Sequence, residues 1–207
     1  ERYICQSCRA AHRKWVGRCD SCGAWNSIVE EQPVNTGPKG LGSKRGGQVI
    51  ELVGLKGMDA PVDRWISGIT EFDRACGGGL VPGSAILVGG DPGIGKSTIL
   101  LQAAAMLSSR DISCLYVSGE EATGQIRMRA QRLGLDASPL KLGSENNVRN
   151  ILATMEAERP DVVVIDSIQT MFADSIESAP GTVSQVRTCA QELIYFAKKH
   201  GCAVILV

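Results

Sequence analysis

Hydrophobic residues beyond position 84 follow two patterns, short continuous runs and longer stretches of helical periodicity. The continuous runs cover residues 85–88, 112–118, 161–166 and 202–207. Runs of this kind are typical of strands that are buried on both faces of a sheet. Helical spacing of apolar residues occurs between them, over 98–107, 121–133, 148–155 and 182–200. Because strands and helices alternate, the pattern predicts an α/β fold with a mostly parallel sheet and helices on both faces.

The first 48 residues lack this alternation and divide into two parts. Residues 1–30 hold two closely spaced cysteine pairs and form the first expected module. Residues 31–48 are dominated by Gly, Pro and polar residues without periodicity, which is typical of a flexible linker. Apolar residues return at 49–52, which we expect to form a strand, so the core domain is expected over 49–207.

The cysteine pairs have the spacing of a metal site. Cys5 and Cys8 are followed, after ten intervening residues, by Cys19 and Cys22. Two such turns bring four thiolates around one point, which suits tetrahedral Zn²⁺ in a closed, structural site. Two disulfides or an iron–sulfur cluster are the alternatives. The neighbouring Trp15 and Trp25 are expected to pack over the cysteine turns rather than to stack on bases.

Composition and charge give no sign of a membrane protein, and they do not indicate a particular binding partner. The net charge of the 207 residues is zero, so no overall field favours nucleic acid or membrane. No apolar run approaches the roughly 20 residues of a membrane span, and no secretory signal opens the chain. We therefore expect a cytoplasmic protein with reduced cysteines and no membrane contact.

A glycine-rich segment after the run at 85–88 carries the strongest chemical signal. It comprises Gly90, Asp91, Pro92, Gly93, Ile94, Gly95, Lys96 and Ser97, and it leads through Thr98 into a predicted helix. A strand, this glycine pattern and a helix together predict a phosphate-binding loop, whose backbone amides and helix N-terminus face the phosphates. Lys96 is expected to reach the β- and γ-phosphates of a nucleotide, and Ser97 to hold Mg²⁺.

Two acidic positions follow later strands of the predicted sheet. Asp166 ends the run at 161–166, where it is placed to bind Mg²⁺ directly or through water. Glu120 and Glu121 follow the run at 112–118, where a carboxylate can orient the water that attacks the γ-phosphate. Both could instead cap the next helix, and we favour Glu120 as the base. Upstream, Thr70 is expected to cap a short helix that ends before Gly77.

Several segments together resemble the RadA/Sms family of bacterial DNA-repair proteins. They are the cysteine pairs, Trp15–Cys19, Cys22–Asn26, Gly77–Ser84, Gly90–Thr98, Tyr116–Glu121 and Ile165–Thr170. The resemblance implies a RecA-like P-loop NTPase core, an ATP- and Mg²⁺-dependent DNA helicase that drives branch migration in recombination, a homo-hexamer, single-stranded DNA and branched DNA intermediates as substrates, and a recombinase partner. It also implies that Lys96 and Ser97 bind nucleotide and Mg²⁺, that Glu120 activates water and that Asp166 lies on the magnesium side.

The resemblance also implies that the chain is a piece of a longer protein. It stops at Val207, inside a predicted strand and before the Lon-protease-like domain of the family, and it begins without Met. Residues 171–181 match a loop that contacts DNA in related recombinases, but they hold Asp174 and Glu177 and no Lys or Arg, so we expect a plain connector. A regulatory ATPase or kinase acting on proteins, and a non-catalytic interaction fragment, are the alternative functions.

Overall fold

The computed structural model describes residues 2–5, 10–12, 14, 16–25, 28–31, 52, 54 and 63–207. It divides the chain into two compact units, Glu1–Gly57 and Met58–Val207, and each is treated by itself. Glu31 ends a strand, whereas the rest of the expected linker and most of the expected strand at 49–52 lie outside the described residues. The division into a module, a linker and a core with the predicted boundaries stays a prediction.

A parallel sheet of five strands forms the centre of the larger unit. Its strands are β4 (Ala85–Leu87), β5 (Cys114–Ser118), β6 (Lys141–Ser144), β7 (Val162–Asp166) and β8 (Ala203–Leu206). They lie side by side in the order β4-β8-β7-β5-β6. The predicted parallel sheet is thereby confirmed, and the strand order places the carboxyl ends of β5 and β7 next to one another.

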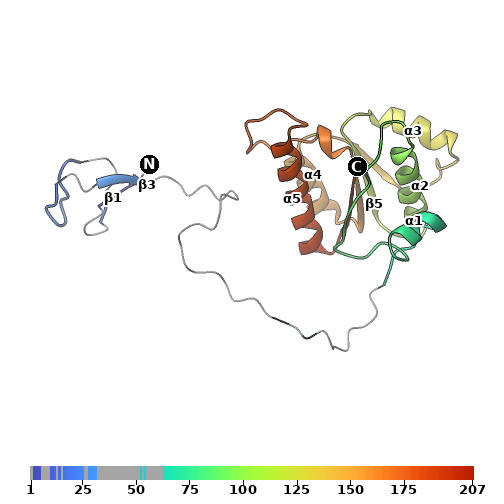
Figure 1. Cartoon of the computed structure of the whole chain (residues 1–207), viewed down its shortest axis with the longest axis horizontal. Coiled ribbons are helices and arrows are strands. Elements are labelled where there is room, and N and C mark those ends of the chain that lie inside the picture. The colour runs from blue at the N-terminus through green and yellow to red at the C-terminus, as the bar shows by residue number, and fades with distance from the viewer. Residues whose placement is uncertain are drawn as a thin grey trace. The chain divides into compact units, whose positions relative to one another are not determined.

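Helices cover both faces of this sheet, as predicted. They are α1 (Thr70–Ala75), α2 (Lys96–Ser108), α3 (Thr123–Arg132), α4 (Val148–Glu158) and α5 (Val183–His200), with a 3₁₀ turn, η1, at Ile168–Thr170. Figure 1 shows α1, α2 and α3 on one side of the strands and α4 and α5 on the other. No helix among the described residues is long and apolar enough to cross a bilayer.

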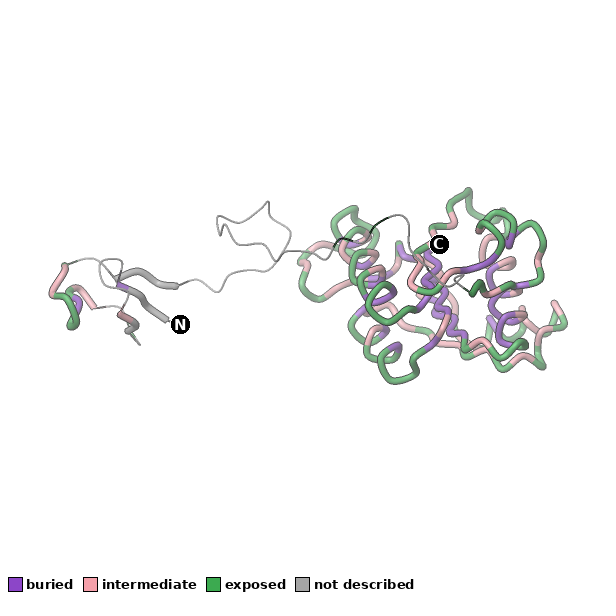
Figure 2. The backbone as a smooth tube through the Cα atoms, turned by 90° about the horizontal axis from the view of Figure 1, so that it is seen from below, coloured by how far each residue is buried: buried purple, intermediate pink, exposed green. Residues whose placement is uncertain are grey.

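Alternate side chains of each central strand pack into two separate hydrophobic cores, one on each face of the sheet. On β5, Leu115 and Val117 pack in the cluster that includes α4 and α5. Tyr116 faces the other way, into the cluster that includes Leu100 of α2 and Ile126 of α3. Figure 2 shows the buried positions concentrated in the strands and along the inward sides of the helices. Burial on both faces explains why these strands appear in the sequence as unbroken apolar runs.

The buried carboxylate of Asp73 holds the segment that precedes α1. Asp73 of α1 accepts hydrogen bonds from the backbone N–H of Ser67 at 2.9 Å, the Ser67 hydroxyl at 2.8 Å and the backbone N–H of Gly68 at 2.8 Å. The expectation that Thr70 caps α1 is wrong, because Thr70 is the first helical residue and Ile69 occupies the cap position without a side-chain bond. The Ser67 hydroxyl, which accepts from the Ile69 N–H at 3.1 Å, stabilises this end of the helix instead.

The smaller unit contains a three-stranded antiparallel sheet that the sequence pattern did not predict. Its strands are β1 (Arg2–Cys5), β2 (Ala11–His12) and β3 (Ile28–Glu31), in the order β2-β1-β3. Cys5 lies at the end of β1, opposite Ile28 of β3. The sheet is too small to supply a core of its own, which is consistent with folding around a metal ion.

Candidate functional site

The phosphate loop lies between β4 and α2, as predicted. Gly93 and Gly95 adopt positive φ values of 79° and 101°, and Gly95 is the residue from which α2 begins. Only glycine takes these angles without strain, so the turn accounts for two of the glycines in the motif. Lys96 and Ser97 open the helix, where its unpaired amides and its dipole favour an anion.

The backbone of this loop leaves hydrogen-bond donors without a protein acceptor. Across residues 63–207, no hydrogen bond of the structure uses the N–H groups of Gly93, Ile94 or Gly95. The Lys96 ammonium donates to the carbonyl oxygens of Gly90 at 2.8 Å and Asp91 at 2.9 Å, so its charge lies over the same loop. Unused amides beneath an ammonium group fit the phosphates of a nucleotide.

Glu120 and Glu121 lie beside Asp166 at the carboxyl edge of the sheet. The pairing of β5 with β7 sets Ser118 opposite Asp166. The next residue, Gly119, donates its backbone N–H to the Asp166 carbonyl at 2.9 Å. The Ser118 hydroxyl accepts the backbone N–H groups of Glu120 at 3.2 Å and Glu121 at 2.9 Å. The structure thus brings together two of the predicted acidic positions from strands that lie about 50 residues apart in sequence.

The two glutamates have different partners. The Glu120 side chain is exposed, and its Oε1 accepts a hydrogen bond from the Ser167 hydroxyl at 2.8 Å. Glu121 is paired with the Arg129 guanidinium of α3 at 2.9 Å. The Arg129 guanidinium occupies one oxygen of the Glu121 carboxylate and leaves this side chain less open to water than the exposed Glu120. The geometry therefore favours Glu120 as the water-orienting residue.

Asp166 has a partner that no pattern in the sequence indicated. The hydroxyl of the buried Tyr116 donates a hydrogen bond to Oδ2 of Asp166. Burial, and next the hydrogen bond and charge of Asp166, hold the pKa of the Tyr116 phenol well above its usual range. Tyr116 is therefore neutral and is the donor in this contact. Arg129 approaches the same phenol oxygen, with Nη2 at 3.4 Å.

Gly119 lets the loop that carries Glu120 pack closely against the segment after Asp166. A Cβ at this position would lie 2.1 Å from Thr170 Oγ1 and 2.6 Å from Asn146 Nδ2. The Asn146 amide donates to the carbonyls of Gly119 at 2.9 Å and Thr170 at 3.0 Å, so it ties the two segments together. Neither Asn146 nor this role of Gly119 was predicted from the sequence.

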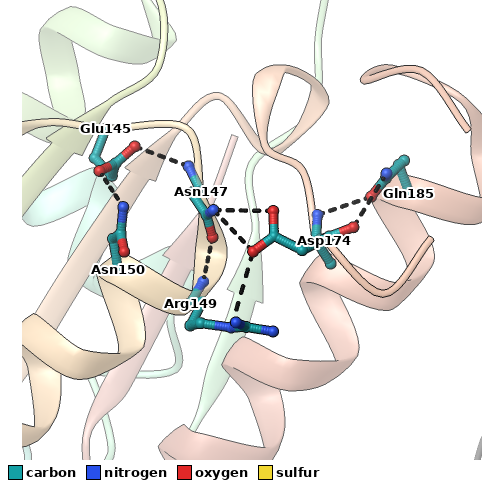
Figure 3. Close-up of polar contacts among 7 residues, drawn as sticks. Glu145, Asn147, Arg149, Asn150, Asp174 and Gln185 are labelled. Atoms are coloured by element: carbon teal, nitrogen blue, oxygen red, sulfur yellow. Dashed lines mark hydrogen bonds and ion pairs between the residues drawn. The ribbon is translucent and has the colours of Figure 1, made fainter. Parts of the chain in front are cut away.

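A second polar cluster follows β6 and reaches the segment after η1, as Figure 3 shows. Glu145 accepts from the backbone N–H groups of Asn146 and Asn147, at 2.8 and 3.0 Å, and from the Asn150 side chain at 2.8 Å. These bonds, the one from Asn147 first, hold the pKa of Glu145 below its ordinary 4.5. The Asn147 amide in turn donates to both carboxylate oxygens of Asp174 at 3.1 Å.

The predicted connector at 171–181 is held by one buried side chain. Gln185 of α5 is 1% exposed, accepts the Ala173 N–H at 2.9 Å and donates to the carbonyls of Ile176 at 3.0 Å and Ser178 at 2.8 Å. These contacts occupy backbone groups of residues 173–178 that a ligand could otherwise bind. They agree with the expectation of a connector, which stays a prediction.

Three of the four paired cysteines form a cluster in the smaller unit. The Sγ atoms of Cys5, Cys19 and Cys22 lie within 4.8 Å of one another, whereas Cys8 lies outside the described residues. Cys5 and Cys22 are separated by 3.7 Å, which is far longer than a disulfide and matches the edge of about 3.8 Å expected for a tetrahedral zinc–thiolate site. The donor set therefore fits zinc.

The second cysteine pair lies in a tight turn, whereas Trp15 lies outside the described residues and its expected packing stays a prediction. The Cys19–Gly23 turn is closed by the Gly23 N–H donating to the Cys19 carbonyl at 2.8 Å, with Gly23 at a φ of 74°. The expectation that Trp25 packs over the cysteines is wrong, because the ring is 71% exposed and the Arg18 guanidinium lies 5.7 Å from its centroid.

Cysteines of the larger unit have a different environment. Burial raises the pKa of the Cys114 thiol to about 11 and that of the Cys202 thiol to about 12. Both are buried, neutral thiols, so they behave as small apolar residues.

Two families of known proteins match separate parts of the chain. An AAA domain family matches residues 55–207, and a family described as a rubredoxin metal binding domain matches residues 3–30. The protein named "DNA repair protein RadA" of Brucella abortus is 53% identical over 214 residues, which cover 100% of this chain and 46% of that protein. The chain belongs to the RadA family.

Two further relatives with the same name support this assignment. That of Pseudomonas aeruginosa is 49% identical, over 99% of this chain and 45% of its own length. That of Bacillus subtilis is 42% identical, over 100% of this chain and 46% of its own length. The resemblance drawn from the motifs is confirmed, and the chain spans just under half the length of these family members.

Proposed function

We propose that this chain is the ATP-hydrolysing portion of a DNA-dependent motor that acts in DNA repair. The main support is that the N–H groups of Gly93, Ile94 and Gly95 have no acceptor among the described residues, in a loop whose Gly90 and Asp91 carbonyls hold the Lys96 ammonium. The match to the AAA domain family and the name shared by the relatives support the same proposal.

In this proposal residues 90–98 hold the phosphates of ATP. The amides and Lys96 bind the phosphate oxygens, while Ser97 and Asp166 hold Mg²⁺. Bound Mg²⁺ supplies positive charge that offsets the charge of the β- and γ-phosphates. Because Lys96 already contacts the loop carbonyls, its ammonium exchanges these partners for phosphate oxygens without a large movement of the backbone.

Glu120 orients the attacking water in the proposed reaction. Its carboxylate is exposed and, within the part of the chain that the structure describes, bonded only to the Ser167 hydroxyl at 2.8 Å, so it remains accessible to water. Glu121, paired with Arg129, supports the loop instead. The loop itself is held on the sheet by the Ser118 hydroxyl and by Asn146, so that Glu120 is placed before a nucleotide binds.

The DNA-directed part of the proposal rests on the family. We propose a homo-hexameric helicase that uses single-stranded DNA and branched recombination intermediates, drives branch migration and works with a recombinase. Zn²⁺ held by Cys5, Cys8, Cys19 and Cys22 stabilises the smaller unit in this assembly. The cytoplasm is the proposed location.

The direct test is ATP hydrolysis by this chain and by a full-length family member, with and without single-stranded DNA, beside the Lys96→Ala variant. We expect turnover that single-stranded DNA stimulates and that Lys96→Ala reduces by at least about 100-fold. Turnover without any effect of DNA would contradict the motor and favour an ATPase that acts on proteins. Nucleotide binding without turnover in either protein would contradict the enzyme and favour an interaction module.

A further inference from the structure

Tyr116 is the one described side chain hydroxyl that contacts Asp166, and it does so from within the core. It lies on β5, two residues before the edge residue Ser118 that pairs with Asp166, and its ring is fully buried against the α2 side of the sheet. Its hydroxyl donates to Asp166 Oδ2. A ring packed on all sides has few alternative positions, so it fixes where this oxygen of Asp166 lies.

The Tyr116 phenol oxygen also accepts a hydrogen bond from the guanidinium of Arg129. Arg129 of α3 reaches it with Nη2 at 3.4 Å and reaches Glu121 with Nη1 at 2.9 Å. The Arg129 side chain is only 15% exposed, and Glu121 is its ion-pair partner among the described residues. A largely buried guanidinium is stable only with such partners, so Arg129 holds Glu121 and Tyr116 in a fixed relation.

These contacts join the same two loops twice. One connection runs from Asp166 through Tyr116 and Arg129 to Glu121. The other joins a neighbouring residue in each loop, because the Ser167 hydroxyl donates to Glu120 at 2.8 Å. The carboxylate expected to lie beside Mg²⁺ and the carboxylate expected to orient water therefore belong to one hydrogen-bonded frame.

We propose that Tyr116, supported by Arg129 and Glu121, is a positioning residue that holds the Asp166 carboxylate ready for nucleotide-bound Mg²⁺. This inference rests on the proposed nucleotide site and adds to it the residues behind Asp166. Hydrogen bonds to a metal-binding carboxylate orient it, and their loss commonly lowers metal affinity by about 10- to 100-fold.

The test is the Mg²⁺ concentration that half-saturates binding of a fluorescent ATP analogue to the whole chain, for the wild type and for Tyr116→Phe. We expect the required Mg²⁺ concentration to rise about 10-fold, while binding of the analogue in EDTA stays unchanged. Tyr195→Phe is the matched control, because it removes the same hydroxyl from a side chain that is 66% exposed on α5. Its Mg²⁺ requirement should equal that of the wild type.

A second variant separates positioning from stability. Arg129→Lys keeps the charge but cannot reach Tyr116 and Glu121 together, and we expect a rise of about 3-fold in the Mg²⁺ requirement. The double variant should need little more Mg²⁺ than Tyr116→Phe alone, because both substitutions interrupt the same chain of contacts. Thermal unfolding of every variant identifies any that fails to fold, and Arg129→Lys then decides the matter alone.

The outcomes for the inference and for the proposed function are distinct. An unchanged Mg²⁺ requirement in folded Tyr116→Phe and Arg129→Lys, with normal Mg²⁺-dependent binding in the wild type, would overturn the positioning role and leave the nucleotide site intact. Absence of Mg²⁺-dependent nucleotide binding in the wild type would overturn both.

Discussion

The phosphate loop and the segment after η1 both leave the carboxyl edge of the sheet, yet they differ in how their polar groups are used. The amides of Gly93, Ile94 and Gly95 have no acceptor among residues 63–207, and the loop is exposed. By contrast, Gln185 occupies donors and acceptors of the 173–178 backbone, and Asn147 occupies Asp174. Unused donors indicate a place for a ligand, whereas the polar side chains of the second segment serve its own structure.

The largest expected effect separates the two tandem glutamates that follow β5. Glu120→Gln should reduce ATP turnover by about 100- to 10,000-fold, because it removes the proposed base while keeping the shape of the side chain. Glu121→Gln should reduce it by less than about 10-fold, since Glu121 supports Arg129. Steady-state hydrolysis at saturating ATP measures both, and the opposite ranking would assign the base to Glu121.

A smaller effect is expected where the two loops pack together. Gly119→Ala would press its Cβ against Thr170 and Asn146, so the free energy of unfolding should fall by about 1–3 kcal/mol and turnover should fall with it. Gly124→Ala is the control, because its Cβ meets nothing within 4 Å and alanine favours a helix by about 1 kcal/mol. Denaturant unfolding should show a lower free energy of unfolding for Gly119→Ala and a higher one for Gly124→Ala. Equal stability of the two variants would contradict the packing argument.

Gln185→Leu tests how far the Gln185 side chain stabilises the 173–178 segment. The substitution leaves the Ala173 N–H and two carbonyls without their partner, so the free energy of unfolding should fall by about 2–3 kcal/mol. Nucleotide affinity should not change, because the contacts of Gln185 are with residues 173–178 and Cys189.

Gln191→Leu, an exposed position on the same helix, controls for the change of residue type. A Gln185→Leu protein of normal stability, or one with weakened nucleotide binding, would count against the separation of the two regions.

The smallest effect concerns the pH dependence contributed by Glu145. Hydrogen bonds from Asn147, Asn150 and Asn146 lower its pKa in the folded protein below the ordinary 4.5. Its contribution to stability is therefore complete above pH 4.5 and disappears as the pH falls through the lower folded value. Glu145→Gln should lose less than about 1 kcal/mol at pH 7 and converge with the wild type at the acidic end. A constant difference across this range would contradict the assignment.

Local patterns predict most of the larger unit because its strands are buried on both faces. The runs at 112–118 and 161–166 correspond to β5 and β7, and helical spacing locates α3, α4 and α5 within a few residues. The pattern does not predict β6, since an edge strand composed of Lys141, Leu142, Gly143 and Ser144 is partly exposed and has no apolar run. The three strands of the smaller unit are short and also lack such a run.

The site is predictable only where one segment contains the whole signal. The phosphate loop has a fixed spacing, so its residues are recognisable from the sequence alone. The contact of Tyr116 with Asp166 depends on the register of two parallel strands, and nothing in either segment encodes it alone. Arg129 and Asn146 likewise act on segments far away in sequence, and no local pattern distinguishes them from surface residues.

The central claim is that the unused amides of the phosphate loop form the ligand site, and amide chemical shifts test it most directly. We would record ¹H–¹⁵N spectra of the chain while adding Mg²⁺ and a non-hydrolysable ATP analogue, with Lys96→Ala as the control. We expect large shifts for Gly93, Ile94 and Gly95, no comparable shifts for Asn147 and Ala173, and no shifts in Lys96→Ala. Unmoved loop amides, or shifts concentrated in the segment held by Gln185, would contradict the claim.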